Sequence, residues 1–104
     1  MSEVRLERWS VQDGLLTERR LMKLMEFEGY TVLVYTYRPG RIFSPHQHPQ
    51  DKCDAVLEGT LRITVAEDVY DLGPGDRLYL PALTLHNAAV VGEKTVVSLD
   101  GTLW

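Results

Sequence analysis

The sequence has 104 residues, of which 44% are hydrophobic and 25% charged, and this length and balance are typical of a single globular domain over residues 1–104. Its 15 acidic and 11 basic residues give a formal charge of −4, and the basic residues do not cluster. We therefore expect neither nucleic acid nor a membrane as a partner. A single cysteine, together with the lack of an apolar signal segment, predicts a cytoplasmic protein.

Short runs rich in Val, Leu, Ile, Tyr and Thr lie between Gly and Pro turn signals along the whole chain. Such runs predict β-strands. In chain order they are residues 20–27, 31–37, 54–57, 61–66, 69–72, 77–80, 86–91 and 95–99. For the first run a short helix is the alternative, because good helix formers surround its apolar residues. We favour a strand that turns at Glu28-Gly29 into the next run.

The stretch "TLRITV" at residues 60–65 shows the alternation that decides the fold class. Leu61, Ile63 and Val65 share one face of an extended strand, and Arg62 lies on the other face with the two threonines. This pattern indicates antiparallel sheets that are buried on one side. Several short strands of this kind predict an all-β sandwich, jelly roll or barrel.

The three histidines of the chain are its candidate metal ligands. His46 and His48 are one residue apart, so on extended backbone both imidazoles point to the same side. His86 follows a second bend, marked by Pro81. Three neutral imidazoles suit Zn, Fe, Ni, Mn or Cu and leave coordination positions open for water or substrate. We therefore expect a divalent transition metal at His46, His48 and His86.

Two segments resemble the two motifs of the cupin family. The first is "GRIFSPHQHPQDKCDAVLEG", residues 40–59, and the second is "GDRLYLPALTLHNAAV", residues 75–90. The resemblance implies a small single-domain cupin, which is a double-stranded β-helix or jelly-roll barrel whose motif histidines converge on one internal metal. The chain departs from the family pattern at Lys52, Leu83 and Val90, where the family has Glu, Gly and Asn.

The missing glutamate leaves several alternatives for the residues after His48. Lys52 takes the Glu position when counted back from Gly59, and it would then have to lose its proton, turn outward or replace the metal. Cys53 takes the position when counted forward, and its thiolate would favour Zn or Cu(I). Asp54 has the strand parity of the histidines, although Pro49-Gln50-Asp51 is expected to turn the chain. In the competing interpretation one of Lys52, Cys53 and Asp54 is buried in the core and the other two face water.

Strand tyrosines are further candidates for the lining of a pocket. Tyr35, Tyr37 and Tyr79 each combine an apolar ring with a phenol donor. The competing interpretation places them in the strand core with their hydroxyl groups at its rim.

The resemblance implies three classes of function. The first is an enzyme of the dioxygenase, isomerase or decarboxylase type that acts on a small oxygenated molecule. The second is a non-catalytic cupin that binds a sugar or carboxylate, without metal if Lys52 replaces the motif Glu. The third is a metal-free structural dimer. Because small cupins often pair, the resemblance also implies a homodimer with a small-molecule ligand.

Overall fold

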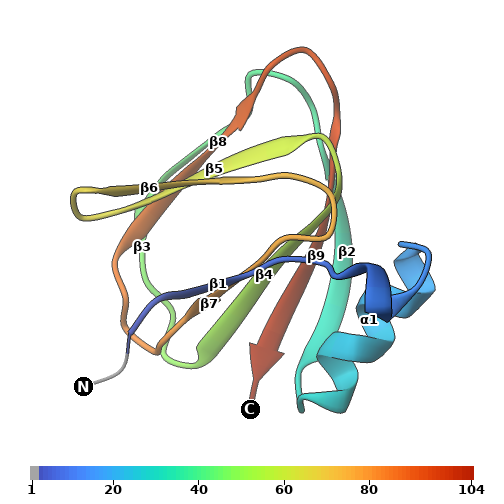
Figure 1. Ribbon diagram of the computed structural model, residues 1–104. Helices are drawn as coiled ribbons and strands as arrows, with labels where there is room; N and C mark the ends of the chain where they lie inside the picture. The colour runs from blue at the N-terminus through green and yellow to red at the C-terminus, as the bar shows by residue number, and fades with distance from the viewer. Residues whose placement is uncertain (1–2) are drawn as a thin grey trace.

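Two antiparallel β-sheets face each other in the computed structural model, which describes residues 3–104, and one α-helix lies outside them (Figure 1). The described strands are β1 (Arg5–Glu7), β2 (Thr31–Tyr37), β3 (Ile42–His46), β4 (Asp51–Glu58), β5 (Thr60–Val65), β6 (Asp68–Leu72), β7 (Arg77–Leu80), β8 (His86–Val91) and β9 (Val96–Leu103). The helical segments are the 3₁₀ turn η1 (Val11–Asp13) and the helix α1 (Glu18–Phe27).

The strand order defines the two layers. Within the described residues the five-stranded sheet has the order β1-β7-β4-β9-β2, and the four-stranded sheet has the order β3-β8-β5-β6. Every paired strand is antiparallel to its neighbour. This arrangement confirms the predicted all-β jelly-roll class.

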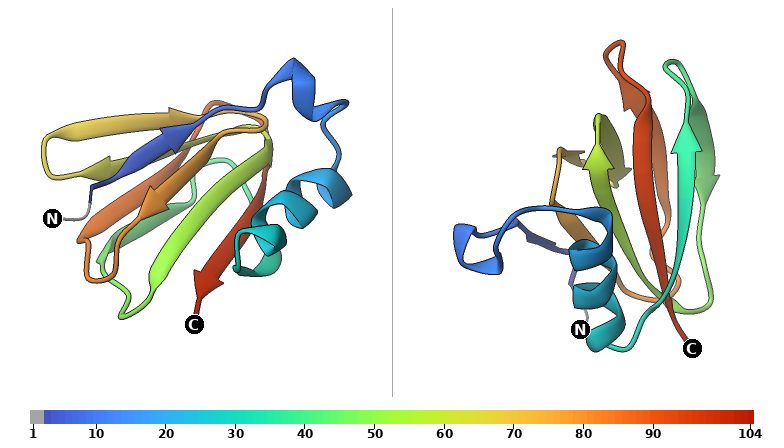
Figure 2. Two further views of the ribbon diagram at one scale, coloured as in Figure 1. Left: turned by 60° about the horizontal axis from the view of Figure 1, so that its bottom comes forward. Right: turned by 90° about the vertical axis from the view of Figure 1, so that its right-hand side faces the viewer.

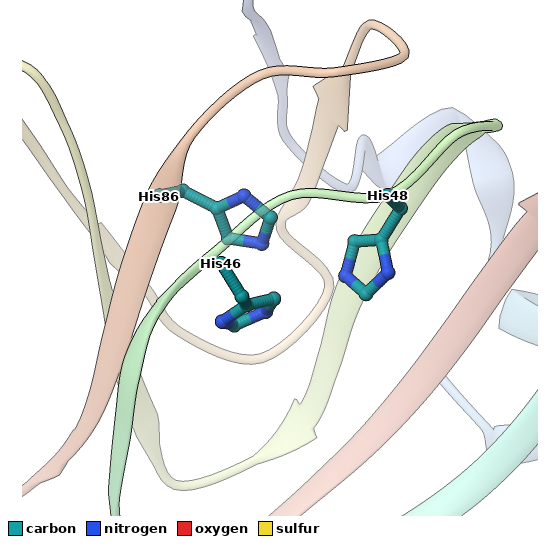
Figure 3. Close-up of side chains that lie close together, drawn as sticks. All are labelled: His46, His48 and His86. Atoms are coloured by element: carbon teal, nitrogen blue, oxygen red, sulfur yellow. The ribbon is translucent and has the colours of Figure 1, made fainter.

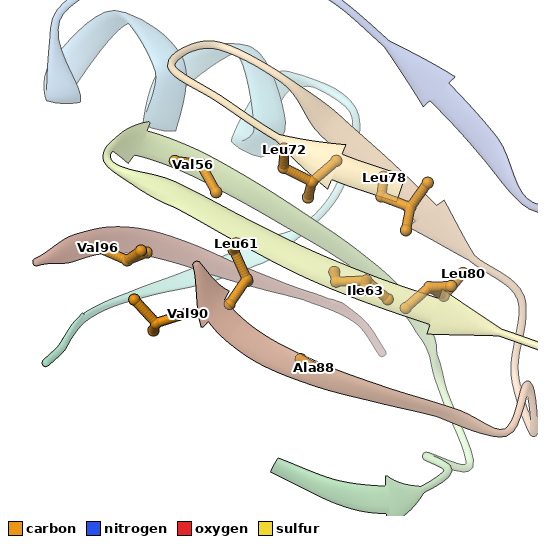
Figure 4. Packing of buried hydrophobic residues seen from close by; sticks show 9 residues of the cluster. All are labelled: Val56, Leu61, Ile63, Leu72, Leu78, Leu80, Ala88, Val90 and Val96. Carbon is orange, nitrogen blue, oxygen red and sulfur yellow. The ribbon is translucent and has the colours of Figure 1, made fainter. Parts of the chain in front are cut away.

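Aliphatic side chains from both sheets fill part of the space between them. Figure 4 shows nine of these residues: Val56, Leu61, Ile63, Leu72, Leu78, Leu80, Ala88, Val90 and Val96. The alternation expected in β5 is present, because Leu61 and Ile63 are buried while Arg62 is exposed. Burial of apolar surface at this interface is the main favourable contribution to folding of the two-sheet unit.

Residues 20–27 belong to α1, so the strand predicted there is wrong and the helical alternative occurs. Thr17 caps the helix, since its Oγ1 accepts a hydrogen bond from the Arg20 amide at 3.1 Å. Leu21 and Met25 are four residues apart and fully buried. Figure 2 shows α1 on the outer side of the five-stranded sheet. The two side chains belong to a cluster with Cys53, Ala55, Tyr79 and Leu99. None of the described helical segments has the length and apolarity to cross a bilayer.

Other strands are longer than predicted or were not predicted. β1 and β3 were not among the predicted runs, and Pro45 lies within β3, where a proline is tolerated because β3 is an edge strand. β4 begins at Asp51 and β9 continues to Leu103. These two extensions matter for the site, because they add inward-facing side chains to the five-stranded sheet.

Alanine substitution tests the position of α1. Leu21→Ala and Met25→Ala should each lower the free energy of unfolding by about 2–5 kcal/mol, because each removes a fully buried side chain. Phe27→Ala is the matched control, since Phe27 is 91% exposed and should change stability by less than about 0.5 kcal/mol. The measurement is denaturant unfolding monitored by circular dichroism. Equal losses at Leu21 and Phe27 would contradict the helical packing, since a strand would place both on one face.

Candidate metal centre

Pairing of β3 with β8 positions two of the three histidines. His46 at the end of β3 lies opposite His86 at the start of β8 in the register of the pair, after an irregularity between Phe43 and His46. His48 follows two residues later, in the connection to β4. Figure 3 shows the three imidazoles near one another, two from the four-stranded sheet and one from this connection.

The ligand atoms of the three histidines lie within 4.8 Å of one another. The ring centroids are 4.4 Å apart for His46 and His86, 5.0 Å for His46 and His48, and 5.5 Å for His48 and His86. His86 is buried and the other two are partly buried. The arrangement therefore offers three nitrogen donors to one ion from neighbouring points of the fold.

Backbone carbonyls orient two of the rings. His46 Nδ1 donates to the Ser44 carbonyl oxygen at 2.6 Å, and His86 Nδ1 donates to the Thr84 carbonyl oxygen at 2.9 Å. Because a carbonyl oxygen only accepts, these bonds place the proton on Nδ1 and leave the Nε2 lone pair free. Histidines that bind metals commonly show this second interaction, which fixes the ring and its tautomer.

A turn on the second segment ties the two histidine segments together. The Leu83 amide donates to the His48 carbonyl oxygen at 2.7 Å, and the Ala82 amide donates to Asp51 Oδ1 at 2.8 Å. Leu83 has a φ of 65°, in the left-handed region that favours glycine. The cupin motif that this segment resembles has Gly at this position, whereas here a leucine takes the left-handed conformation.

Burial keeps two of the histidines neutral. The pKa of His48 is lowered by burial first and then by the positive charges of Lys52 and the other histidines. The pKa of His86 is lowered mainly by burial, against the hydrogen bond to Thr84, which raises it. A lowered imidazole pKa leaves the nitrogen lone pair available at neutral pH, as metal binding requires.

The histidines form one wall of a pocket of about 220 Å³ between the two sheets. Phe43, Leu61 and Ala88 make the apolar part of its lining. On the five-stranded sheet the lining comes from β2, β4 and β9, through Tyr37, Asp54, Ser98 and Asp100. A small molecule in this pocket would touch imidazoles on one side and carboxyl and hydroxyl groups on the other.

Lys52 lies on the inward face of β4. Its side chain does not turn outward, and its ammonium group has partners. The residue is 7% exposed, and its Nζ is 2.7 Å from Asp100 Oδ1 and 2.7 Å from Thr102 Oγ1. Thr102 is the residue opposite Lys52 in the β4–β9 register. The lysine at the motif Glu position is thus paired with the carboxylate of Asp100 from β9.

Asp54 and Asp100 lie directly opposite each other in the β4–β9 register and both line the pocket. Burial first, and then the charge of Asp100, raises the pKa of Asp54 to about 7, while Lys52 acts in the opposite direction. Two close carboxyl groups do not readily ionise together, so the charge of Asp100 favours the protonated form of Asp54.

The remaining candidate residues lie elsewhere. Cys53 is fully buried on the outer side of β4, in the cluster with α1, and burial raises the pKa of its thiol. Tyr79 belongs to the same cluster, and its hydroxyl group donates to Glu28 Oε1 at 2.5 Å. Tyr35 stacks on Tyr37 with centroids 6.1 Å apart, but of the three tyrosines only Tyr37 is among the pocket residues.

Sequence reasoning missed Asp100 and Ser98. The predicted last strand, residues 95–99, stops before Asp100-Gly101, whereas β9 continues through both residues to Leu103. The missed signal is the alternation in "VVSLDGTL", which places Val96, Ser98, Asp100 and Thr102 on one face of the strand. Gly101 sits on the other face, where a Cβ would lie 3.0 Å from Met25 Cε.

Comparisons with known proteins agree with this geometry. The profile of the cupin domain family matches residues 33–101. A conserved protein of unknown function from Streptococcus pyogenes is similar over 72% of this chain and 64% of its own, with 21% identity and a TM-score of 0.64. KdgF from a Halomonas species is similar over 73% of this chain and 70% of its own, with 22% identity and a TM-score of 0.63.

A third similar structure is oxalate decarboxylase from Bacillus subtilis, which has Mn(II) centres. It is 25% identical over 71% of this chain, with a TM-score of 0.62. This chain spans only 21% of the decarboxylase and less than two thirds of the Streptococcus protein. A search of curated proteins found no significant match. These similarities establish the fold. The activity has to be inferred from the residues of the site.

The raised pKa of Asp54 makes stability depend on pH. A carboxyl whose pKa is higher in the folded state than in the unfolded state contributes stability at low pH that is lost as the pH rises through the folded pKa, here near 7. Asp54→Asn keeps a hydrogen-bond donor toward Asp100 and never ionises. At about pH 8 this variant should be more stable by on the order of 1 kcal/mol, or roughly 4–8 °C in Tm.

Measurements at several pH values distinguish loss of the Asp54 charge from a general change in stability caused by the substitution. At about pH 4 the stabilisation by Asp54→Asn should disappear, because Asp54 is then largely protonated in the folded protein. Asp68→Asn, at an exposed aspartate outside the pocket, is the control. Thermal unfolding across this pH range provides the measurement, and a variant that is less stable than the native protein at alkaline pH would contradict the electrostatic argument.

Proposed function

Because the chain belongs to the cupin family, we propose that its three-histidine pocket binds one divalent transition metal ion together with a small oxygenated molecule. The observation that carries this proposal is the placement of three imidazole donors within 4.8 Å of one another in a pocket of about 220 Å³. His46, His48 and His86 would hold the ion. When bound, such an ion acts as a Lewis acid toward a carbonyl or carboxylate oxygen.

The donor set fits the group. Three neutral nitrogen donors without a thiolate suit Mn, Fe, Ni, Cu or Zn, and the buried thiol of Cys53 lies on the opposite side of β4. The similar oxalate decarboxylase has Mn(II) centres, which makes Mn(II) one of the ions to test. Three protein ligands leave coordination positions for water or substrate, as in catalytic rather than structural sites.

The charges of the pocket favour an anionic ligand once the ion is bound. Lys52 and Asp100 form an ion pair, the two histidines with lowered pKa are neutral, and the raised pKa of Asp54 favours its uncharged form. A divalent ion therefore adds positive charge that these groups do not balance. A small carboxylate or enolate would supply the missing negative charge.

Metal-free binding of an anion by Lys52 has weaker support. The ammonium group already has Asp100 and Thr102 as partners at 2.7 Å, and Lys52 is not among the residues that line the histidine pocket. An anionic ligand would have to displace Asp100 to reach it. The lysine therefore holds Asp100 in the acidic wall of the pocket and does not replace the metal.

We also propose that the protein forms a homodimer through β2. In the described part of the chain β2 has a strand partner only on its β9 side, and it exposes Leu33, Val34 and Tyr35. Leu33 is 56% exposed, which is high for a leucine in the middle of a strand. An unprotected apolar edge strand favours pairing with another chain, and a second copy supplies the same edge.

Metal titration tests the proposed site. Calorimetry with Zn²⁺ and Mn²⁺ on protein without a histidine tag should give one site per chain. His46→Ala and His86→Ala should each weaken binding by at least about tenfold, since each removes one of three donors. Gln47→Ala, at the exposed residue between the first two histidines, should bind as the native protein does. Equal affinity in the histidine variants, or no binding by the native protein, would refute the proposal.

Light scattering after size-exclusion chromatography tests the dimer. The native protein should have twice the mass of the chain, and Leu33→Glu should shift it toward the monomer, because a charge replaces apolar surface at the pairing edge. Val69→Glu is the matched control, since Val69 is 57% exposed on β6 in the other sheet. A monomeric native protein, or a dimer that both variants retain, would contradict pairing through β2.

A further inference from the structure

The acidic wall of the pocket is built into the β4–β9 ladder. Lys52 lies opposite Thr102. Asp54, two residues later in β4, lies opposite Asp100, which is two residues before Thr102 in β9. Side chains directly opposite each other on one face have Cβ atoms roughly 4.5–5.5 Å apart, close enough for two carboxyl groups to share a proton. Neither aspartate belongs to the group of three histidines that can hold one ion.

The surroundings give the two carboxyl groups different roles. Asp100 Oδ1 is 2.7 Å from the Lys52 ammonium, so Asp100 is the member of the pair that forms a salt bridge. Among the described residues Asp54 has no salt-bridge partner, and burial and the charge of Asp100 raise its pKa. The protonated partner is therefore Asp54. The other titratable groups that face the pair are Tyr37 on β2, His46 on β3, His48 after β3 and His86 on β8.

A purely structural role does not explain this pair. Two opposed carboxyl groups on adjacent strands repel each other whenever both are ionised, and the pocket gives them an apolar boundary at Phe43, Leu61 and Ala88. Structural costs of this kind are commonly found where a protein needs a group for its function. The pair also faces the histidines across the pocket, where a bound molecule would lie between the two walls.

We propose that Asp54 and Asp100 transfer a proton to and from a small carbonyl compound in the histidine pocket, so that the protein catalyses isomerisation or enolisation. This inference rests on the proposed function, because the histidine wall must hold the oxygen of the same molecule. The substrate class is a small 2-oxo acid or hydroxy-carbonyl compound with a C–H bond next to the carbonyl group.

The proton transfer needs no further reactant. The ionised carboxyl group of the pair removes the proton from the carbon next to the carbonyl group. The C–H electron pair then forms the C=C bond of the enolate, and the carbonyl π pair moves to the oxygen. Return of the proton to the same carbon restores the substrate. In a hydroxy-carbonyl compound the hydroxyl proton on the deprotonated carbon moves to the former carbonyl oxygen, and return of the removed proton to the former carbonyl carbon then gives the isomeric hydroxy-carbonyl compound. No oxidant or reductant is consumed, which distinguishes this chemistry from that of an oxygenase.

Lys52 is a positioning residue in this scheme, because it acts through Asp100. Its ammonium lowers the pKa of Asp54 and holds Asp100 by a direct ion pair. Lys52→Met should therefore move the titration of Asp54 to higher pH. Lys52→Arg keeps the charge and should leave the titration closer to that of the native protein.

Deuterium exchange tests the proposal. Native protein loaded with Zn²⁺ is incubated in D₂O with pyruvate or dihydroxyacetone, and loss of the C–H signal is followed by proton NMR. Asp54→Asn and Asp100→Asn should each lower the exchange rate by about 100-fold or more, in the range of general acid–base catalysis. Asp68→Asn is the control and should exchange at the native rate. Zn²⁺ affinity, measured on the same samples, should be within a few-fold of native in all three variants.

A second readout needs neither metal nor substrate. Carbon-13 NMR of protein labelled at the aspartate carboxyl carbons should show one carboxyl that titrates near neutral pH and is lost in Asp54→Asn. A normal acidic titration of Asp54 would overturn the pair, whether or not metal binds. Native Zn²⁺ binding without exchange of either probe, or with equal exchange in the variants, would overturn the proton-transfer role and leave the metal site standing. Failure of Zn²⁺ binding alone would refute the proposed function.

Discussion

Antiparallel pairing of β3 with β8 sets His46 opposite His86, and the rest of the site depends on this register. The bond from the Leu83 amide to the His48 carbonyl oxygen then connects the two segments beyond the ends of these strands. A shift of one residue would turn one imidazole to the other face of its sheet. Backbone geometry therefore brings the three donors together, and backbone carbonyls of Ser44 and Thr84 also orient two of the rings.

The opposite wall follows from the same principle in the other sheet. Inward positions of β4 and β9 place Lys52, Asp54 and Asp100 in one row. In place of the motif glutamate the chain has a lysine, but the ion pair with Asp100 cancels its charge. The charged groups of the pocket thus come from two strands, β4 and β9. The two carboxyl groups do not belong to the proposed set of metal ligands. In the proposed function this separation would let the histidine wall bind an ion while the aspartate wall transfers protons.

Sequence patterns predicted the fold class and the histidine cluster because both depend on short periods along the chain. Alternation in β5 and the His46-Gln47-His48 spacing express strand geometry directly. The strand predicted at 20–27 was wrong, because composition does not show that Leu21 and Met25 bury one helical face against the sheet. Asp100 was missed because Asp-Gly usually ends a strand, whereas β9 continues and Gly101 makes room for Met25. The pairing of Lys52 with Asp100 joins residues far apart in the chain, and no local pattern carries it.

The central claim is that three imidazoles from two distant segments share one ion between the sheets. Anomalous X-ray scattering from crystals soaked in Zn²⁺ tests it most directly, because the signal gives the position of the ion independently of its effect on activity. The account predicts one strong peak per chain, within coordination distance of nitrogens of His46, His48 and His86 and apart from Asp54 and Asp100. A peak bound by the aspartates would contradict this proposal. The absence of a peak between the histidines after a soak at saturating Zn²⁺ concentration would also contradict it.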